Sequence, residues 1–115
     1  MSNPLRSTLQ FEFFSNEVIS ADVDSKSVNL GESEGPISIM VAWEDGSSVD
    51  MTFSLLVSNN NVNFTEIAES VQTISGNSGV HIWDILTGVE FMKVRALVNG
   101  GSATFYVELN AKTRN

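Results

Sequence analysis

The most regular feature of the sequence is an alternation of apolar and polar side chains in short segments along the chain. The longest such segment covers residues 49–57, where every second residue from Val49 to Val57 is apolar. Side chains of a β-strand point alternately to its two faces, so such a segment buries one face and exposes the other. The same pattern recurs over shorter stretches in residues 9–13, 37–43, 62–64, 71–73 and 80–82.

Residues that favour turns separate these segments. Gly, Asn, Asp, Ser and Pro cluster in residues 31–36, 45–48, 59–61 and 75–79. Residues 65–71 contain helix-forming side chains but are too few for a stable helix, so we expect at most one helical turn there. About eight short strands bounded by turns are typical of an all-β protein, either an antiparallel β-sandwich or a jelly roll.

The C-terminal part of the sequence predicts a β-hairpin. Two apolar strand patterns, residues 91–98 and 103–109, are separated by Asn99-Gly100-Gly101. The inward-facing side chains of this hairpin would be Met92, Val94, Ala96, Val98, Ala103, Phe105, Val107 and Leu109. Its outward-facing side chains would be Phe91, Lys93, Arg95 and Leu97, beside Thr104, Tyr106 and Glu108. An outer face that is partly apolar is a candidate contact surface.

The apolar residues around Trp83 change phase. Val80 and Ile82 share one face of an extended strand, whereas Trp83 and Ile85 share the other. One extra residue reverses which side chains point inward, so the sequence predicts a β-bulge at this place. His81 would then lie opposite Val80 and Ile82, at a sheet surface.

Length and composition favour one domain. We assign residues 1–8 to an N-terminal arm, 9–109 to a β-sandwich domain and 110–115 to a C-terminal arm. The absence of Cys excludes disulfides and zinc–thiolate sites. No apolar run is long enough for a membrane-spanning helix, and the first residues lack a signal-peptide pattern. We therefore expect synthesis in the cytoplasm and no membrane partner.

The chain is acidic, with a formal net charge of −8. A nucleic-acid-binding protein needs a basic patch that neutralises phosphates, so we expect no nucleic-acid partner. All basic residues lie outside residues 27–92; they are Arg6, Lys26, Lys93, Arg95, Lys112 and Arg114. Two interpretations stay open. Either the acidic surface keeps the chain soluble by self-repulsion, or the termini and the last hairpin face an acidic partner.

The sequence offers few groups for catalysis or metal binding. His81 is the only histidine, which excludes a two-histidine metal site and leaves few general bases near neutral pH. Carboxylate pairs at residues 22/24, 32/34 and 44/45 lie in polar stretches, where we expect solvated loops. The pair Asp22/Asp24 is similar to the start of a calcium loop, but Lys26 and Ser27 replace a ligand and the glycine. We expect no enzyme, no cofactor and no metal site.

Two stretches carry a resemblance to known proteins. Residues 54–67 look like a strand-turn-strand unit in which a polar Ser-Asn turn precedes an aromatic and then an apolar residue. This unit also occurs in fibronectin-like and discoidin-like modules. Residues 91–98, followed by 101–105, are similar to the closing hairpin of small β-sandwich virion structural proteins of tailed bacteriophages. The resemblance implies a capsid decoration protein, or another head or tail component, more than an enzyme.

Together, the patterns and the resemblance give the hypothesis of a phage virion structural protein, in particular a capsid decoration or cement protein. It would dock on the assembled shell through a strand face and its terminal arms. Its partners would be the major capsid protein or other virion proteins, in a homo-oligomer or symmetric array. Aromatic residues and Arg are enriched where protein surfaces meet. The partner-binding residues would be Phe91, Arg95, Leu97, Tyr106, Arg6 and Arg114.

The alternative is a carbohydrate- or receptor-binding β-sandwich module associated with a tail or fibre. Exposed aromatic side chains and loop carboxylates would hold a sugar, with or without calcium. Tyr106 is the best exposed aromatic candidate, whereas Trp43 is in phase with the apolar residues of segment 37–43 and is expected in the core. The sequence leaves both hypotheses open.

Overall fold

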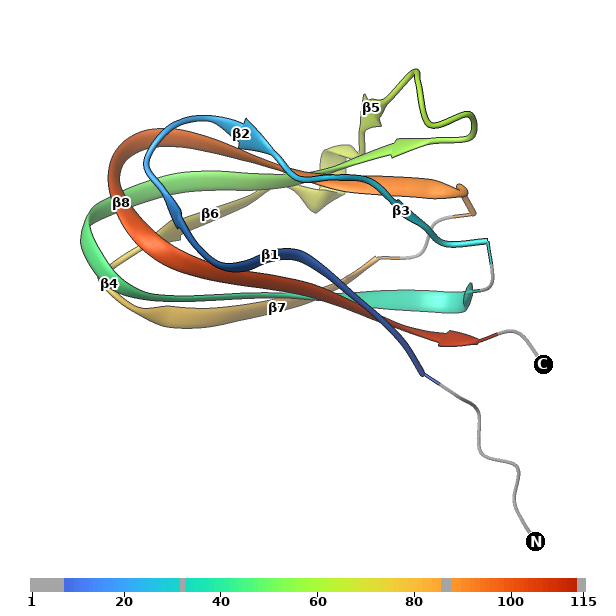
Figure 1. The fold of residues 1–115 in the computed structure, drawn as a ribbon, viewed down its shortest axis with the longest axis horizontal. Coiled ribbons are helices and arrows are strands. Elements are labelled where there is room, and N and C mark those ends of the chain that lie inside the picture. The colour runs from blue at the N-terminus through green and yellow to red at the C-terminus, as the bar shows by residue number, and fades with distance from the viewer. Residues whose placement is uncertain (1–7, 32, 86–87, 114–115) are drawn as a thin grey trace, which may run out of the picture.

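A computed structural model describes residues 8–31, 33–85 and 88–113 and shows an all-β protein (Figure 1). The strands are β1 (Thr8–Ile19), β2 (Val23–Asp24), β3 (Val28–Asn29), β4 (Ser33–Ser58), β5 (Thr65–Glu66), β6 (Gln72–Ser75), β7 (Gly79–Ile85) and β8 (Phe91–Thr113). All strand pairs are antiparallel, which confirms the predicted fold class. A 3₁₀ helix, η1 (Ala68–Ser70), confirms the single helical turn expected before β6. Within the described ranges, no helix has the length and apolar character needed to cross a membrane.

Strands β4 and β8 form a long two-stranded ribbon that bends over on itself (Figure 1). The turn expected at residues 45–48 and the hairpin expected at residues 99–101 are wrong, because both strands continue through these segments. The two segments lie opposite each other, with Ser47 paired with Ser102. Register shifts flank this pair, so the ribbon bends through β-bulges while its strands stay paired.

The residues of the bend adopt backbone conformations that ordinary strand residues avoid. Asp45, Ser48 and Gly101 have positive φ angles of 55°, 53° and 76°. A Cβ atom on Gly101 would overlap the carbonyl oxygens of Ser47 and Ser48. Glycine fits this close approach because it has no Cβ and adopts a positive φ at little cost. The turn-forming residues therefore bend the ribbon here instead of closing two hairpins.

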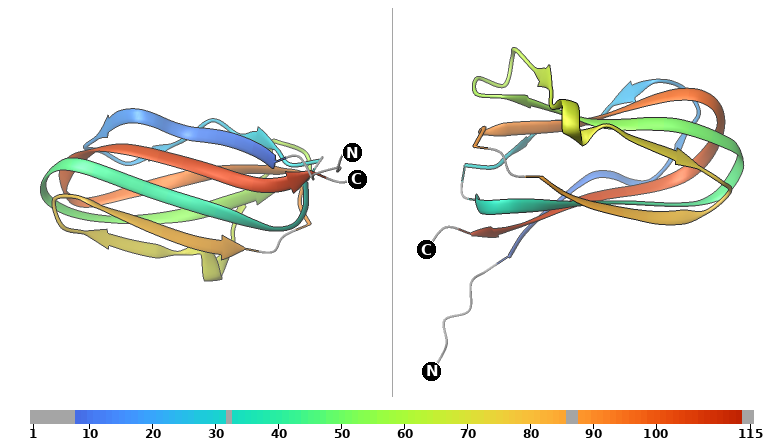
Figure 2. Two further views of the ribbon diagram at one scale, coloured as in Figure 1. Left: turned by 90° about the horizontal axis from the view of Figure 1, so that it is seen from below. Right: turned by 180° about the vertical axis from the view of Figure 1, so that it is seen from behind.

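The bend divides the molecule into two layers (Figures 1 and 2). Layer 1 has the strand order β1, second half of β8, first half of β4, β7. Layer 2 has the order β2 and β3, first half of β8, second half of β4, then β5 and β6. Two antiparallel layers that share their central strands in this way form a jelly roll, one of the two architectures expected from the sequence.

The core lies between the layers and consists of the inward-facing residues of the alternating segments. The predicted inward set of β8 is buried, apart from Val98, which is half-buried. The inward-facing residues predicted for 49–57 are buried, and Met51, Phe53 and Leu55 have no exposed surface. Ser54 and Leu56, on the face predicted to be exposed, are buried as well. A period of two therefore identifies the inward-facing residues even where the ends of the strands are predicted wrongly, but it misses burial on the opposite face.

Aromatic rings fill the centre of the core. The ring centroid of Phe105 lies 5.2 Å from that of Phe53 and 6.2 Å from that of Trp43. The indole N–H of Trp43 donates a hydrogen bond of 3.0 Å to the carbonyl of Gly76. A Cβ atom on Gly79 would lie 2.8 Å from Cζ2 of Trp43, so a larger residue there would displace the indole. Trp43 is thus a core residue, as expected.

Strand β7 is regular, and the β-bulge expected near Trp83 is wrong. The strand pairs with β4 from Gly79 to Ile85 without a register shift. Ile85 is buried and Trp83 is half-buried on the inner side, while Val80 and Ile82 point outward with exposed fractions of 63% and 59%. Both faces of this strand are apolar, so the sequence pattern does not identify the one that faces the core.

His81 lies opposite Val80 and Ile82, as expected, on the inner side of β7 at the edge of the molecule. It is half-buried, and its Nε2 atom lies 2.8 Å from Oε1 of Gln72 on β6. The imidazole also packs against Trp83, with ring centroids 5.4 Å apart. His81 therefore links the edge strands of the two layers.

The boundary predicted for the C-terminal arm is wrong, because β8 continues to Thr113. Residues 110–113 pair with β1 and β4, and Ala111 is buried. The predicted contact residues Arg6 and Arg114 lie in the predicted arms and outside the described residues.

Candidate contact surfaces

The bend of β8 decides which outward-facing residues share a surface. Phe91, Arg95 and Leu97 lie in the first half of β8, on the outer side of layer 2. Tyr106 lies in the second half of β8, on the outer side of layer 1. The contact face predicted from a hairpin is therefore split between opposite sides of the molecule. That each residue binds a partner stays a prediction.

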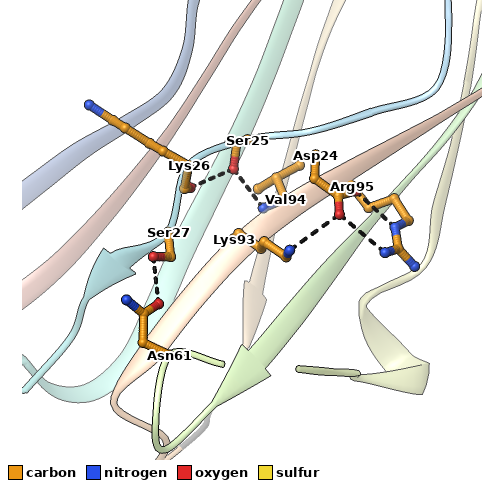
Figure 3. A network of polar contacts seen from close by, with 8 residues as sticks. All are labelled: Asp24, Ser25, Lys26, Ser27, Asn61, Lys93, Val94 and Arg95. Carbon is orange, nitrogen blue, oxygen red and sulfur yellow. Dashed lines mark hydrogen bonds and ion pairs between the residues drawn. The ribbon is translucent and has the colours of Figure 1, made fainter. Parts of the chain in front are cut away.

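An ion-pair cluster occupies the outer face of layer 2 (Figure 3). The guanidinium of Arg95 donates two hydrogen bonds to Asp24, from Nε at 2.8 Å and from an Nη atom at 3.1 Å. Nζ of Lys93 lies 3.3 Å from the same carboxylate and 4.6 Å from the ring centroid of Phe64. The hydrogen bond from Arg95, followed by that from Lys93, lowers the pKa of Asp24 against the opposing effect of burial. Arg95, a predicted contact residue, is thus already bound within its own chain.

Further hydrogen bonds attach the segment that contains Asp24 to β8 (Figure 3). The N–H of Ser25 donates to the carbonyl of Val94 at 2.8 Å, and the N–H of Val94 donates to Oγ of Ser25 at 2.9 Å. A carboxylate oxygen of Asp22 accepts the N–H of Val98 at 2.7 Å. Asp22 and Asp24 are exposed, as expected for solvated carboxylates, but both carboxylates also bind β8.

The outer face of layer 1 has a different composition. Ile82 on β7 pairs with Met40 on β4, and Val80 pairs with Ala42. Met40 and Ala42 are half-buried, so this part of the face is a patch of four apolar side chains from two neighbouring strands. The sequence pattern did not identify this patch, because the β-bulge predicted near Trp83 left open which face of the strand Val80 and Ile82 occupy.

Carboxylates lie on the same face, across β8 and β1. Glu12 and Glu108 pair directly with each other. The hydroxyl of Tyr106 donates to Glu12 at 2.9 Å, while side-chain amides of Gln10 and Asn110 donate to Glu108 at 3.0 Å and 2.9 Å. The neighbouring Tyr106 hydroxyl, followed by the amides of Asn110 and Gln10, lowers the pKa of Glu108. The neighbouring carboxylates of Glu108 and Glu12 raise the pKa of Tyr106.

No family model matches the sequence, and no curated protein matches it either. Solved structures nevertheless share its fold. The SPBc2 prophage-derived protein YomS is 16% identical with a TM-score of 0.62, over 98% of this chain and 99% of that chain. A protein from the disulfide-linked pili of Bacillus endospore appendages is 10% identical with a TM-score of 0.54, over 99% of this chain and 96% of that chain.

The fold also occurs as part of a larger capsid protein. The VP2 protein in a subviral particle of infectious bursal disease virus is 5% identical with a TM-score of 0.65. The match covers 94% of this chain and 32% of that chain. At such identities the likeness shows the fold, and function has to be argued from the surface.

The aromatic residues bear on the sugar-binding alternative. Trp43 is mostly buried in the core, although it also lines the hollow beside Ala42 and Tyr106. Tyr106 is half-buried, and its hydroxyl is hydrogen-bonded to Glu12. Sugar binding at this chain stays a prediction.

Proposed function

We propose that this chain is a structural protein of a phage or virus particle, in particular a capsid decoration protein that docks on the assembled shell. Its contribution would be protein–protein contact, with no catalytic reaction. The partners would be the major capsid protein or other virion proteins, and the chain would be located in the virion.

The observation that carries this proposal is the exposure of large aliphatic side chains on the edge strands β1 and β7 of layer 1. Val18 is 70% exposed, Val80 63% and Ile82 59%, all on the outer side of layer 1. Covering such a side chain fully stabilises a complex by about 1.5–3 kcal/mol before the costs of association. Val80 and Ile82 are neighbours on β7, and Val18 lies on β1 at the other edge of the layer. Exposed apolar surface of this kind marks sites where proteins meet other proteins.

The fold comparisons support the same proposal. A prophage-derived protein, a viral capsid protein in a subviral particle and a pilus protein all share this jelly roll. In a shell, many copies of a chain bind equivalent sites, so modest contacts at each copy can sum to stable attachment when copies are linked. A small rigid sandwich with a partly apolar outer face suits this arrangement.

The test uses particles purified from cells in which the gene for this chain has been deleted. Purified chain is added to these particles, and the mixture is sedimented. We expect the chain to sediment with the particles and to saturate at a fixed ratio to the capsid protein. An unrelated acidic β-sandwich protein of similar size measures non-specific trapping. If the chain stays in the supernatant at low salt and high protein concentration, the proposal is wrong.

A further inference from the structure

We propose, building on the function proposed above, that the outer face of layer 1 binds a protein surface with an apolar centre flanked by Lys or Arg side chains. This layer 1 contact face is defined by the residues Glu12, Met40, Val80, Ile82, Tyr106 and Glu108. The proposal assigns both the docking surface of the chain and the chemistry of its partner.

The apolar part of the layer 1 contact face is continuous. Ile82 lies opposite Met40, and Val80 lies opposite Ala42. Side chains directly opposite each other in an antiparallel pair have Cβ atoms about 4.5–5.5 Å apart, so the four touch or nearly touch. With more than half of each β7 side chain exposed, Val80 and Ile82 need an apolar surface to cover them.

A shallow hollow next to this patch combines apolar and acidic walls. It has a volume of about 280 Å³, and its lining includes Ala42, Val80, Thr104, Tyr106 and Glu44. Lys and Arg bury the methylene groups of their side chains on apolar surface while the charged end stays near polar groups. The hollow therefore suits a basic side chain, whose stem would lie on Ala42 and Val80 and whose charge would face Glu44.

The acidic part of the face has two carboxylates without an ion pair in the described part of the chain, although Lys26 lines the same hollow as Glu12. Glu12 and Glu108 face each other across β1 and β8, where like charges repel. Their hydrogen-bond donors are the neutral side chains of Gln10, Tyr106 and Asn110. Among residues 8–31, 33–85 and 88–113, no ion pair reaches either carboxylate. A cation from a partner would relieve this repulsion and form charge-assisted hydrogen bonds.

Charge also argues against a second copy of the chain as the occupant. The chain has a net charge of −8, and Asp84 adds a further exposed carboxylate beside the apolar patch. Lys93 and Arg95 lie on the outer face of layer 2, where Asp24 already binds both. Lys112 faces outward on layer 1 near the end of β8, beyond the layer 1 contact face. Two layer 1 contact faces brought together would set Glu12 and Glu108 against carboxylates, whereas a basic surface complements them.

The first test uses the full isotope-labelled chain and a synthetic probe, an octapeptide of alternating Lys and Val. An octapeptide of alternating Glu and Val is the matched control. We expect the Lys peptide to shift the amide resonances of Met40, Ile82 and Glu108, and the Glu peptide to leave them unchanged. Shifts that map to layer 2, equal binding of both peptides, or no binding of the Lys peptide would overturn the proposal.

The apolar contribution is measured with a pair of variants, one on each face. Ile82→Ser removes an exposed aliphatic side chain from the layer 1 contact face, and Leu97→Ser removes one from layer 2. We expect Ile82→Ser to weaken binding of the Lys peptide at least tenfold and Leu97→Ser to leave it within twofold. Circular dichroism and thermal unfolding verify that both variants are folded. Equal affinities would remove Ile82 from the contact and contradict the proposal.

The electrostatic contribution is measured with two double variants that remove the same charge. Glu12→Gln/Glu108→Gln neutralises the facing carboxylates, whereas Glu66→Gln/Glu69→Gln neutralises two exposed acids on β5 and η1. We expect the first to weaken binding at least tenfold and to reduce its salt dependence. The second should behave like the wild type. Equal losses of affinity in both double variants would show that binding depends only on net charge. The assignment of binding to the layer 1 contact face would then be wrong.

The same variants are then applied to the particles lacking the chain. Loss of co-sedimentation for Ile82→Ser but not for Leu97→Ser supports the layer 1 contact face, and the reverse pattern overturns it. If the wild-type chain does not sediment with particles at all, the proposed function is wrong and the peptide measurements alone decide the contact face. Self-association of the free chain that Ile82→Ser abolishes would assign the face to a second copy, against the proposal.

Discussion

On the outer face of layer 2, the carboxylate of Asp24 lies between Lys93 and Arg95, whereas on the outer face of layer 1 the hydrogen-bond donors to Glu12 and Glu108 within the described residues are neutral side chains. The outward-facing aliphatic side chains are also less exposed on layer 2 than on layer 1. Leu97, on the outer side of layer 2, is 39% exposed, less than Val80 and Ile82 of layer 1.

The difference shows how one small fold can carry two surfaces with different capacities for binding. Layer 2 uses its ion pairs to attach the segment around Asp24 to β8, so a partner would have to compete with contacts that already exist. Layer 1 leaves like charges facing each other and aliphatic groups in water. A partner can therefore gain more binding free energy on layer 1, by covering apolar groups and neutralising carboxylates, than on layer 2.

The largest effect is expected from a change at the bend that creates the two faces. Gly101→Ala places a Cβ against the carbonyls of Ser47 and Ser48 at a residue whose φ is 76°. The left-handed conformation and the overlap together should lower the free energy of unfolding by about 2–4 kcal/mol. Urea unfolding measures it. Gly100→Ala is the matched control, because a Cβ there would lie 3.8 Å from the nearest atom, the carbonyl oxygen of Ser48.

If Gly101→Ala were no less stable than Gly100→Ala, the sharp bend would not be required for the two-layer arrangement. The predicted hairpin at residues 99–101 would then have to be considered again for the chain in solution.

The bend also illustrates what the sequence predicts and what it does not. Alternation along β4 and β8 identifies core residues such as Phe53 and Phe105, because burial of every second side chain does not depend on where a strand ends. Turn-forming residues at 45–48 and 99–101 indicate only that the backbone can leave the extended conformation there. Whether it reverses or bends depends on pairing between segments far apart in the sequence, such as Ser47 with Ser102.

The candidate contact face was missed for a related reason. In β7 both faces are apolar, and only the packing of Trp83 and Ile85 against the other strands leaves Val80 and Ile82 outside. Tyr106 was identified correctly as an outward-facing residue, but its neighbours come from β1 and β4, not from the first half of β8. Such neighbours are a property of the sheet order, which local patterns do not encode.

The next largest effect concerns the ion pairs of layer 2. Asp24→Asn removes the carboxylate that binds Lys93 and Arg95 and should lower the free energy of unfolding by about 0.5–1 kcal/mol, as is usual for exposed ion pairs. Asp84→Asn, the same change on the exposed side of layer 1, should have a smaller effect. Urea unfolding of both variants at low and high salt measures the difference, and equal values would contradict the proposed contrast between the faces.

Acid should destabilise the protein through both faces, but more through layer 2. Folding lowers the pKa of Asp24 and of Glu108 from their ordinary values of 3.8 and 4.5. The stabilisation is therefore complete above these values and is lost as the pH falls through the lowered pKa of each group. Charged donors stabilise a carboxylate more than neutral donors do, so Asp24→Asn should flatten the acid dependence more than Glu108→Gln. The urea concentrations at the unfolding midpoints of both variants, measured at neutral and at acidic pH, show which variant has the weaker acid dependence.

The smallest effect is spectroscopic and concerns layer 1 alone. Tyr106 is the only tyrosine of the chain, so alkaline absorbance reports its ionisation directly. Because its hydroxyl donates to carboxylates, its pKa is raised above the ordinary value of 10.0. We expect Glu12→Gln/Glu108→Gln to return the titration toward that value, while Asp24→Asn leaves it unchanged. A titration that does not respond to either change would mean that the carboxylates of layer 1 do not face Tyr106, and the acidic part of the contact face would be lost with them.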